Sequence, residues 1–293
     1  MKLKLPQNKS LDLSFTKVMG TIVLYPEDSR SIEEIVELAH SFVRSGAELL
    51  EVGTKKTDFN LDDVDESRVC CVVEALIKEL SVPIAVNSDN PSVIINAIKL
   101  GVSMIITSSG LDSEEAIKAF KESEAVVCIH CEPSERVDDD TDVVSLISEF
   151  FYSKIDSLLN SGIARKRIVI DPSIINASVN SKLRLIGRLE SFRSFALPIC
   201  VGIPRQLPLE DVLLKENRTL SLTAAVFCAS DKAVQIIRTT DVSEIAIAIG
   251  FWQVMSAKTK PYRLSKSIVR RLRTLRDAIR GLGKNNHITK REN

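Results

Sequence analysis

Hydrophobic and polar positions along this chain alternate between two kinds of segment. Short runs of apolar, often β-branched residues are followed by longer segments in which apolar residues recur every three or four positions. The first pattern is typical of strands buried on both faces, and the second of helices with one apolar stripe. Eight such pairs with short connections favour closure into a (β/α)₈ TIM barrel over an open doubly wound sheet.

The predicted elements follow one another in strict alternation. The strands are residues 18–24, 49–54, 83–88, 103–109, 125–131, 167–173, 198–204 and 233–241. The helices are residues 31–45, 66–80, 91–100, 113–122, 143–160, 181–195, 219–230 and 242–257. We therefore expect one barrel domain over residues 1–258, close to the usual size of this fold of about 250 residues.

The charge of the chain is balanced overall but unevenly distributed. Residues 259–293 hold 11 of the 39 basic residues and two of the 39 acidic ones, which leaves 28 basic against 37 acidic residues before them. The spacing of Ile268, Leu272, Leu275 and Ile279 predicts a helix over residues 265–280 within this basic C-terminal extension. Such a tail could bind nucleic acid or another anionic surface, or lie on its own acidic body.

The cysteine content and the hydrophobic runs predict a cytoplasmic protein without a membrane span. Six cysteines in 293 residues, without a secretory leader, do not form a disulfide framework of the secreted type. No apolar run approaches the roughly 18 residues of a spanning helix. Cys70 and Cys71 fall in a helical apolar pattern and are expected in the core. We expect no metal at Cys128 and His130, because strand alternation turns Cys131 the other way and no second group of ligands is evident.

Polar side chains stand at the ends of several predicted strands, where a barrel gathers them at one mouth. Asp171 could accept paired hydrogen bonds from an amino-pyrimidine edge, or cap the loop that follows it. Two arginines together could hold a phosphate or stack on a planar ring. The expected mouth residues are Glu51, Asn87, His130, Asp171, Arg205 and Arg238.

Several short motifs, in order, resemble those of the dihydropteroate synthase family, whose barrel enzymes join a pterin methyl diphosphate to p-aminobenzoate. Residues 45–53 read S-G-A-E-L-L-E-V-G and are similar to the family's E-G-A-D-I-I-D-I-G. Residues 18–28, 83–88, 127–130, 168–172, 198–206 and 237–242 resemble further family motifs. The resemblance implies a substrate site formed by Glu51, Thr57, Asn87, Asp171, Arg205, Gln206 and Arg238.

Departures from the family pattern affect the groups that act on the diphosphate. Val23 replaces the asparagine that ligates magnesium, so the resemblance makes magnesium doubtful as a cofactor. Asn87 replaces an aspartate of the pterin pocket, and Ile106 an asparagine. Asp58, Gln206 and Thr240 stand where the family has an arginine, a lysine and a histidine.

The pattern therefore predicts a diverged barrel of folate and one-carbon cofactor metabolism that binds a pterin or a similar ring without ordinary synthase turnover. Three alternatives stay open: a functional transferase of the dihydropteroate synthase type, a relative of the pterin-dependent methyltransferases, and a non-catalytic scaffold. A homodimer is expected from the resemblance alone. No residue of the chain is assigned a catalytic role.

Overall fold

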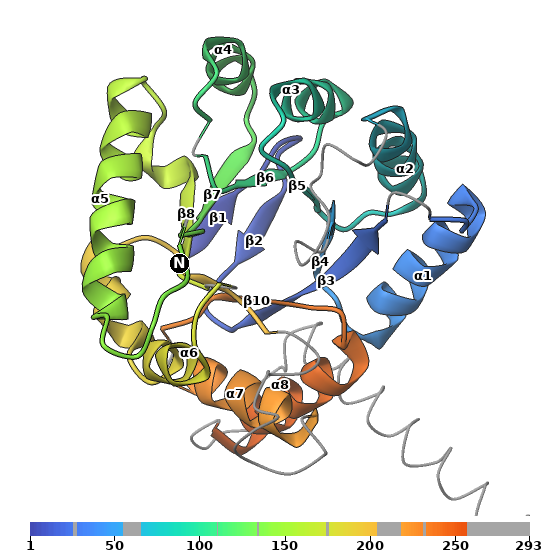
Figure 1. The fold of residues 1–293 in the computed structure, drawn as a ribbon. Coiled ribbons are helices and arrows are strands. Elements are labelled where there is room, and N and C mark those ends of the chain that lie inside the picture. Colours follow the sequence, from blue (N-terminus) through green and yellow to red (C-terminus); the bar gives the residue numbers. More distant parts are fainter. Residues whose placement is uncertain are drawn as a thin grey trace, which may run out of the picture.

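Eight parallel strands form the barrel that the sequence predicts, and helices α1 to α8 surround it (Figure 1). The computed structural model describes residues 1–25, 28–54, 66–109, 111–133, 135–173, 176–203, 218–230 and 233–256. The strand order is β8-β7-β6-β5-β4-β3-β10-β9. A bridge between Ile170 and Ile199 joins the two edges of this order, and the Ile170 N–H donates to the Pro198 carbonyl at 3.0 Å. The sheet is therefore closed.

The element bounds lie inside or close to the predicted ranges. The barrel strands are β3 (Lys17–Leu24), β4 (Leu49–Thr54), β5 (Ile84–Asn87), β6 (Met104–Thr107), β7 (Val126–His130), β8 (Ile168–Asp171), β9 (Cys200–Gly202) and β10 (Ile236–Thr239). The helices are α1 (Ile32–Ser45), α2 (Glu66–Glu79), α3 (Pro91–Leu100), α4 (Glu114–Glu122), α5 (Val143–Asn160), α6 (Val179–Ile186), α7 (Arg218–Ser230) and α8 (Val242–Ser256). The predicted helix 265–280 and the extension 259–293 lie outside the described residues.

Alternation along each strand separates two apolar regions. Val18 and Ile22 of β3 point outward and pack in the layer between the barrel and its helices. Met19, between them, points into the lumen and joins a second cluster with Leu49 and Ile236. Because successive side chains of a strand face opposite sides, strands buried on both faces supply both clusters at once.

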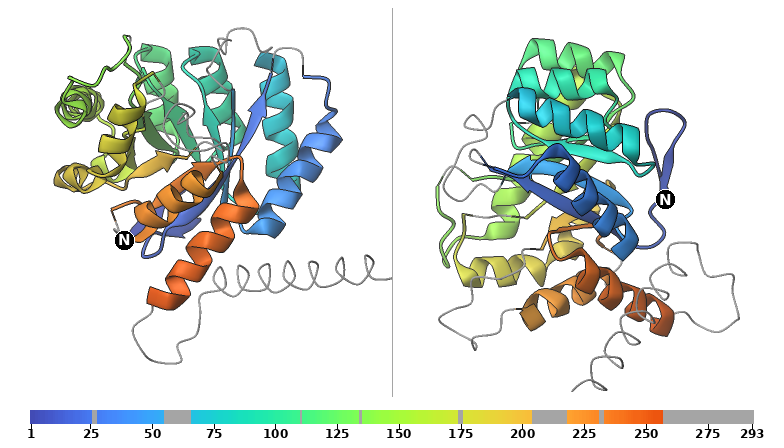
Figure 2. Two further views of the ribbon diagram at one scale, coloured as in Figure 1. Left: turned by 60° about the horizontal axis from the view of Figure 1, so that its bottom comes forward. Right: turned by 90° about the vertical axis from the view of Figure 1, so that its right-hand side faces the viewer.

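A short antiparallel hairpin closes one end of the lumen. Strands β1 (Lys2–Lys4) and β2 (Ser10–Asp12) pair through Leu3 and Leu11, and the hairpin lies at one end of the barrel (Figure 2). Its leucines are buried and belong to the lumen cluster, whose barrel members include Met19 and Leu49 near the starts of their strands. The sequence pattern did not predict this hairpin, because two three-residue strands are too short to show a period.

The predicted helix 181–195 is wrong as a single element. The chain forms α6 and then a 3₁₀ helix, Leu189–Phe195. Three residues per turn place Leu189, Phe192 and Phe195 on one face, and all three are buried. Both phenylalanine rings contact Phe151 of α5 edge-on. An α-helical continuation would turn each of these side chains by about 60° from the one before, so aromatic packing on a single line favours the tighter turn.

The cysteines of α2 do not lie in the core as predicted. Cys70 is half-buried and Cys71 is exposed, whereas Val69, Val72, Val73 and Leu76 form the buried stripe. The helical period was correct, but both cysteines lie outside that stripe. All six cysteines lie among the described residues and none forms a disulfide. Within the described part of the chain, no helix is long and apolar enough to span a membrane.

Candidate active site at the mouth of the barrel

Four of the predicted site residues meet in the part of the barrel toward the carboxyl ends of the strands. Glu51, Asn87, Asp171 and Arg238 come from β4, β5, β8 and β10, and hydrogen bonds link them into one network. Thr57, Arg205 and Gln206, the other three, lie outside the described residues. Parallel strands end at the same rim of a barrel, so residues distant in sequence converge there.

Arg238 joins the two carboxylates. Its Nε donates to Asp171 Oδ2 and its Nη1 to Glu51 Oε1, both at 2.8 Å. The side chains of Asp171 and Glu51 are 0% and 1% exposed, and that of Arg238 is 11% exposed. Burial disfavours the cation, but the Coulombic attraction of Glu51 and Asp171 outweighs it and raises the pKa of Arg238 well above its usual value. The guanidinium is therefore a permanent positive charge between two buried acids.

Gly202 leaves room for the guanidinium of Arg238 beside β9. These residues are partners in the register of β9 and β10. A Cβ at position 202 would stand 3.2 Å from Arg238 Nη2. Only glycine lets the guanidinium lie this close to β9 without a shift.

Hydroxyl and amide groups hold the Glu51 carboxylate from other sides. Thr21 of β3 donates to Oε2 at 2.7 Å, and Asn87 donates to Oε1 at 2.9 Å. Both oxygens thus have protein donors. Thr21 was not among the predicted site residues, although strand alternation places it on the same face as Met19, which points into the lumen.

Ser173 donates hydrogen bonds to the other oxygen of Asp171. Its backbone N–H and its hydroxyl both donate to Oδ1, at 3.0 Å and 2.5 Å, and its hydroxyl accepts from the Gly202 N–H at 2.7 Å. Asp171 thus also caps its own loop, as one of the sequence-based interpretations proposed. Ser173 was missed, but a serine two residues after an aspartate is a common signal of such a turn.

His130 of β7 lies beside this network without joining it. Its Nδ1 is 3.8 Å from Asp171 Oδ2, too far for a hydrogen bond, and has no partner among the described residues. Desolvation by burial lowers the pKa of His130, and Asp171 only partly opposes this. The ring is therefore neutral at pH 7.

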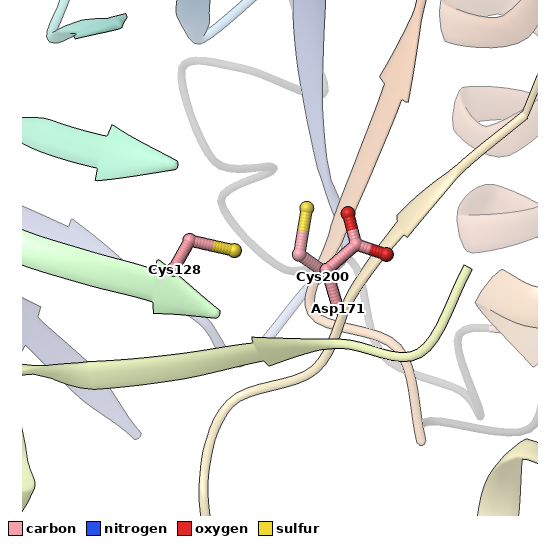
Figure 3. Close-up of side chains that lie close together, drawn as sticks. All are labelled: Cys128, Asp171 and Cys200. Atoms are coloured by element: carbon pink, nitrogen blue, oxygen red, sulfur yellow. The ribbon is translucent and has the colours of Figure 1, made fainter. Parts of the chain in front are cut away.

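Two cysteines lie close to the Asp171 carboxylate. Cys128 of β7 and Cys200 of β9 place their sulfur atoms, with an Asp171 oxygen, within 4.8 Å of one another (Figure 3). Burial, with a smaller contribution from Cys128, raises the pKa of the Cys200 thiol well above its usual value. Cys200 was not predicted as a site residue, because it lies on a different strand, far along the chain from Cys128.

The described residues do not fit the magnesium ion that the family resemblance implies. Val23 on β3 offers two methyl groups where an oxygen ligand is needed. Its backbone carbonyl already accepts from Arg30 Nη2 at 2.5 Å. Two further positions among the described residues also depart from the family pattern. Ile106 is buried and is the register partner of Asn87, and Thr240 is exposed just beyond β10.

A closed parallel barrel with a buried network of two acids and one arginine at its carboxyl rim has the architecture of a ligand-binding or catalytic barrel. A profile of the family described as "Pterin binding enzyme" matches residues 27–240. The chain belongs to this family.

Dihydropteroate synthases are among the relatives of this chain. That of Escherichia coli (strain K12) is 29% identical over 262 residues, which cover 83% of this chain and 93% of the relative. That of Bacillus subtilis (strain 168) is 28% identical over 249 residues, covering 79% and 85%. The structure of the Coxiella burnetii enzyme in complex with pteroic acid matches with a TM-score of 0.78 and 26% identity, over 88% of this chain and 100% of that one.

Proposed function

We propose that the mouth of this barrel binds a pterin or a similar planar heterocycle, and that the protein turns over slowly or not at all as a dihydropteroate synthase. The supporting observation is the network of Glu51, Asp171 and Arg238. It keeps Asp171 and Arg238, which the family resemblance places at the ring, and Glu51, which has one methylene more than the family's aspartate. Val23, in contrast, offers no ligand for magnesium. Ring binding and diphosphate chemistry depend on different groups, so a chain can retain one without the other.

The state of Asp171 determines how a ring would bind. A carboxylate offers about four acceptor positions, and Ser173 and Arg238 fill three of those on Asp171. A pyrimidine edge needs two. The Ser173 hydroxyl must therefore rotate away, or Arg238 must move over the ring face, when the ligand enters. Arg238 is suited to that position because a guanidinium stacks on flat rings.

Loss of cations is the reason to expect little turnover. Departure of diphosphate builds negative charge, and each preorganised donor that stabilises such charge contributes on the order of 3 kcal/mol to lowering the barrier. Val23, Gln206 and Thr240 remove a metal ligand, a lysine and a histidine relative to the family pattern. The barrier for this step should rise accordingly.

Calorimetry with a pterin, beside a condensation assay on the same preparation, tests the proposal. We expect measurable pterin affinity in the full chain, its loss in Asp171→Asn, and no condensation with p-aminobenzoate in the presence of magnesium. Asp156→Asn is the matched control, because Asp156 is an exposed acid near the end of α5 that accepts from Asn160 and takes no part in the network at the mouth. Circular dichroism of each variant establishes that it is folded.

Ser173→Ala gives a test with the opposite sign. Removing the hydroxyl leaves one more acceptor position on Asp171, so pterin affinity should rise by about fivefold, the equivalent of one net hydrogen bond of about 1 kcal/mol.

The remaining outcomes separate the alternatives. Condensation at ordinary enzymatic rates would overturn the loss of turnover and establish a functional synthase. Methyl transfer from a methylated pterin would favour a relative of the pterin-dependent methyltransferases. Absence of any pterin affinity would contradict the proposal and favour a scaffold.

A further inference from the structure

We propose that Cys128, Cys200 and Asp171 form a binding site for Zn²⁺ inside the barrel, with His130 as the fourth ligand. The three ligand atoms lie within 4.8 Å of one another, on strands β7, β8 and β9 (Figure 3). The site is distinct from any magnesium position near Val23, and the proposal does not rest on pterin binding.

The geometry suits a small cation. Three atoms no more than 4.8 Å apart always have a point within about 2.8 Å of each, and Zn²⁺ sits at about 2.3 Å from sulfur and 2.0–2.2 Å from oxygen. Inward shifts of about half an ångström therefore complete the coordination, and small side-chain rotations supply them. All three residues face the lumen, so the backbone need not move.

His130 provides the second, independent observation. It lies two residues after Cys128 on β7, so both side chains face the lumen, and it is the register partner of Asp171. Its side chain is only 8% exposed, and its Nδ1 is 3.8 Å from Asp171 Oδ2 with no hydrogen-bond partner among the described residues. A buried ring nitrogen without a partner is costly. Rotation toward a metal would satisfy it.

The donor set selects the metal. Two sulfurs, one imidazole nitrogen and one carboxylate oxygen match the tetrahedral preference of Zn²⁺, whereas Mg²⁺ and Ca²⁺ prefer oxygen alone. On binding, each thiol loses its proton to solvent as its sulfur bonds the metal, so Zn²⁺ replaces two protons. The net charge of the buried site is unchanged, and no new unbalanced charge enters the barrel.

A disulfide is the other use of two nearby cysteines, and the topology opposes it. Cys128 and Cys200 lie on β7 and β9, with β8 between them. Strands about 4.8 Å apart place these backbones roughly 9 Å from each other, beyond the reach of about 7 Å between Cα atoms.

Titration of the metal-stripped full chain with Co²⁺ tests the site, because thiolate ligation produces a charge-transfer band in the near ultraviolet. We expect one Co²⁺ per chain, displaced by Zn²⁺, and loss of the band's intensity in Cys128→Ser and Cys200→Ser. Affinity should fall about 10- to 100-fold in His130→Gln. Cys71→Ser, at an exposed cysteine of α2, is the matched control and should bind as the parent does.

Two results would overturn the proposal: no thiolate band in the parent chain, or a band that survives in the Cys128→Ser, Cys200→Ser double variant. If a buried serine prevents folding, Cys128→Val keeps an apolar side chain of similar volume in the lumen and carries the same test. Metal binding is measured without a pterin and pterin binding without a metal, so either proposal can fail alone.

Discussion

A single side chain, Arg238, balances the charges of the barrel mouth. It donates to two acids that are 187 and 67 residues away in sequence. Water could not replace these hydrogen bonds if Arg238 were lost, since the side chains of both acids are almost fully buried. Arg238 is thus a structural ion-pair partner as well as a candidate ligand-binding residue.

Arg238→Met should therefore destabilise the fold strongly. Removing one partner of a buried ion pair leaves uncompensated charge and typically costs about 3–5 kcal/mol. The free energy of unfolding in urea measures the loss. Arg44→Met is the control, because Arg44 pairs with Glu37 on the surface, and it should change nothing measurable. A small loss in Arg238→Met would mean that the acids take up protons or that water enters the mouth.

Asp89 stabilises the rim beside Asn87 through its charge. Burial raises its pKa, but hydrogen bonds from Ser108, Thr107 and the Ser109 backbone outweigh burial and lower the pKa from 3.8 to about 2. A folded pKa below the unfolded one means that its stabilising effect is present above pH 3.8 and is lost as the pH falls toward 2.

Asp89→Asn tests this pH dependence. Near neutral pH the variant should be less stable by roughly 2 kcal/mol, the size that a shift of about two pKa units implies. That difference should shrink as the pH falls from 4 to 2. Urea unfolding of both proteins across this range measures it, and a difference independent of pH would show that lost packing, and not charge, is responsible.

At the scale of elements, the hairpin β1–β2 supplies the floor of the barrel. Leu3, Leu5, Leu11 and Leu13 are 2%, 4%, 7% and 5% exposed. They pack with the lumen side chains of the barrel strands in one cluster. The mouth residues lie toward the other ends of these strands, so the hairpin leaves the mouth open.

Leu3→Ala should cost about 2–5 kcal/mol of unfolding free energy, the usual range for a buried leucine that leaves a cavity. Leu183→Ala on α6, where the leucine is 45% exposed, is the matched control and should cost no more than about 0.5 kcal/mol. Chemical denaturation compares the two. Equal losses would contradict a structural role for the hairpin.

At the scale of the whole molecule, charge is unevenly distributed: acidic residues predominate over residues 1–258 and basic residues over the C-terminal extension 259–293. We expect the full chain to bind a polyanion such as heparin at low salt, with an affinity that falls as salt rises. The fragment 1–258 should lose this binding, because 11 basic residues of the extension are removed. Retention on a heparin column against salt concentration measures both. Equal retention would place the anion site on the barrel.

Much of the fold followed from local patterns. Apolar runs and helical periods identified every barrel strand and seven of the eight helices within a few residues, since these patterns reflect burial on a face. Strand alternation also indicated that Cys128 and His130 share a side. The exceptions are elements that tertiary packing decides, such as the 3₁₀ helix 189–195, which aromatic contacts with Phe151 favour.

The sequence by itself determined which polar residues the strands bring to the mouth: Glu51, Asn87, Asp171 and Arg238 were identified from position alone. Only the tertiary structure decided their partners. Closure of the barrel brings Arg238 between two acids, lets Ser173 take an oxygen of Asp171, and sets Cys200 beside Cys128. A local pattern reports the face on which a side chain lies, but contacts across the lumen depend on how eight strands are staggered and closed, and no single segment encodes that arrangement.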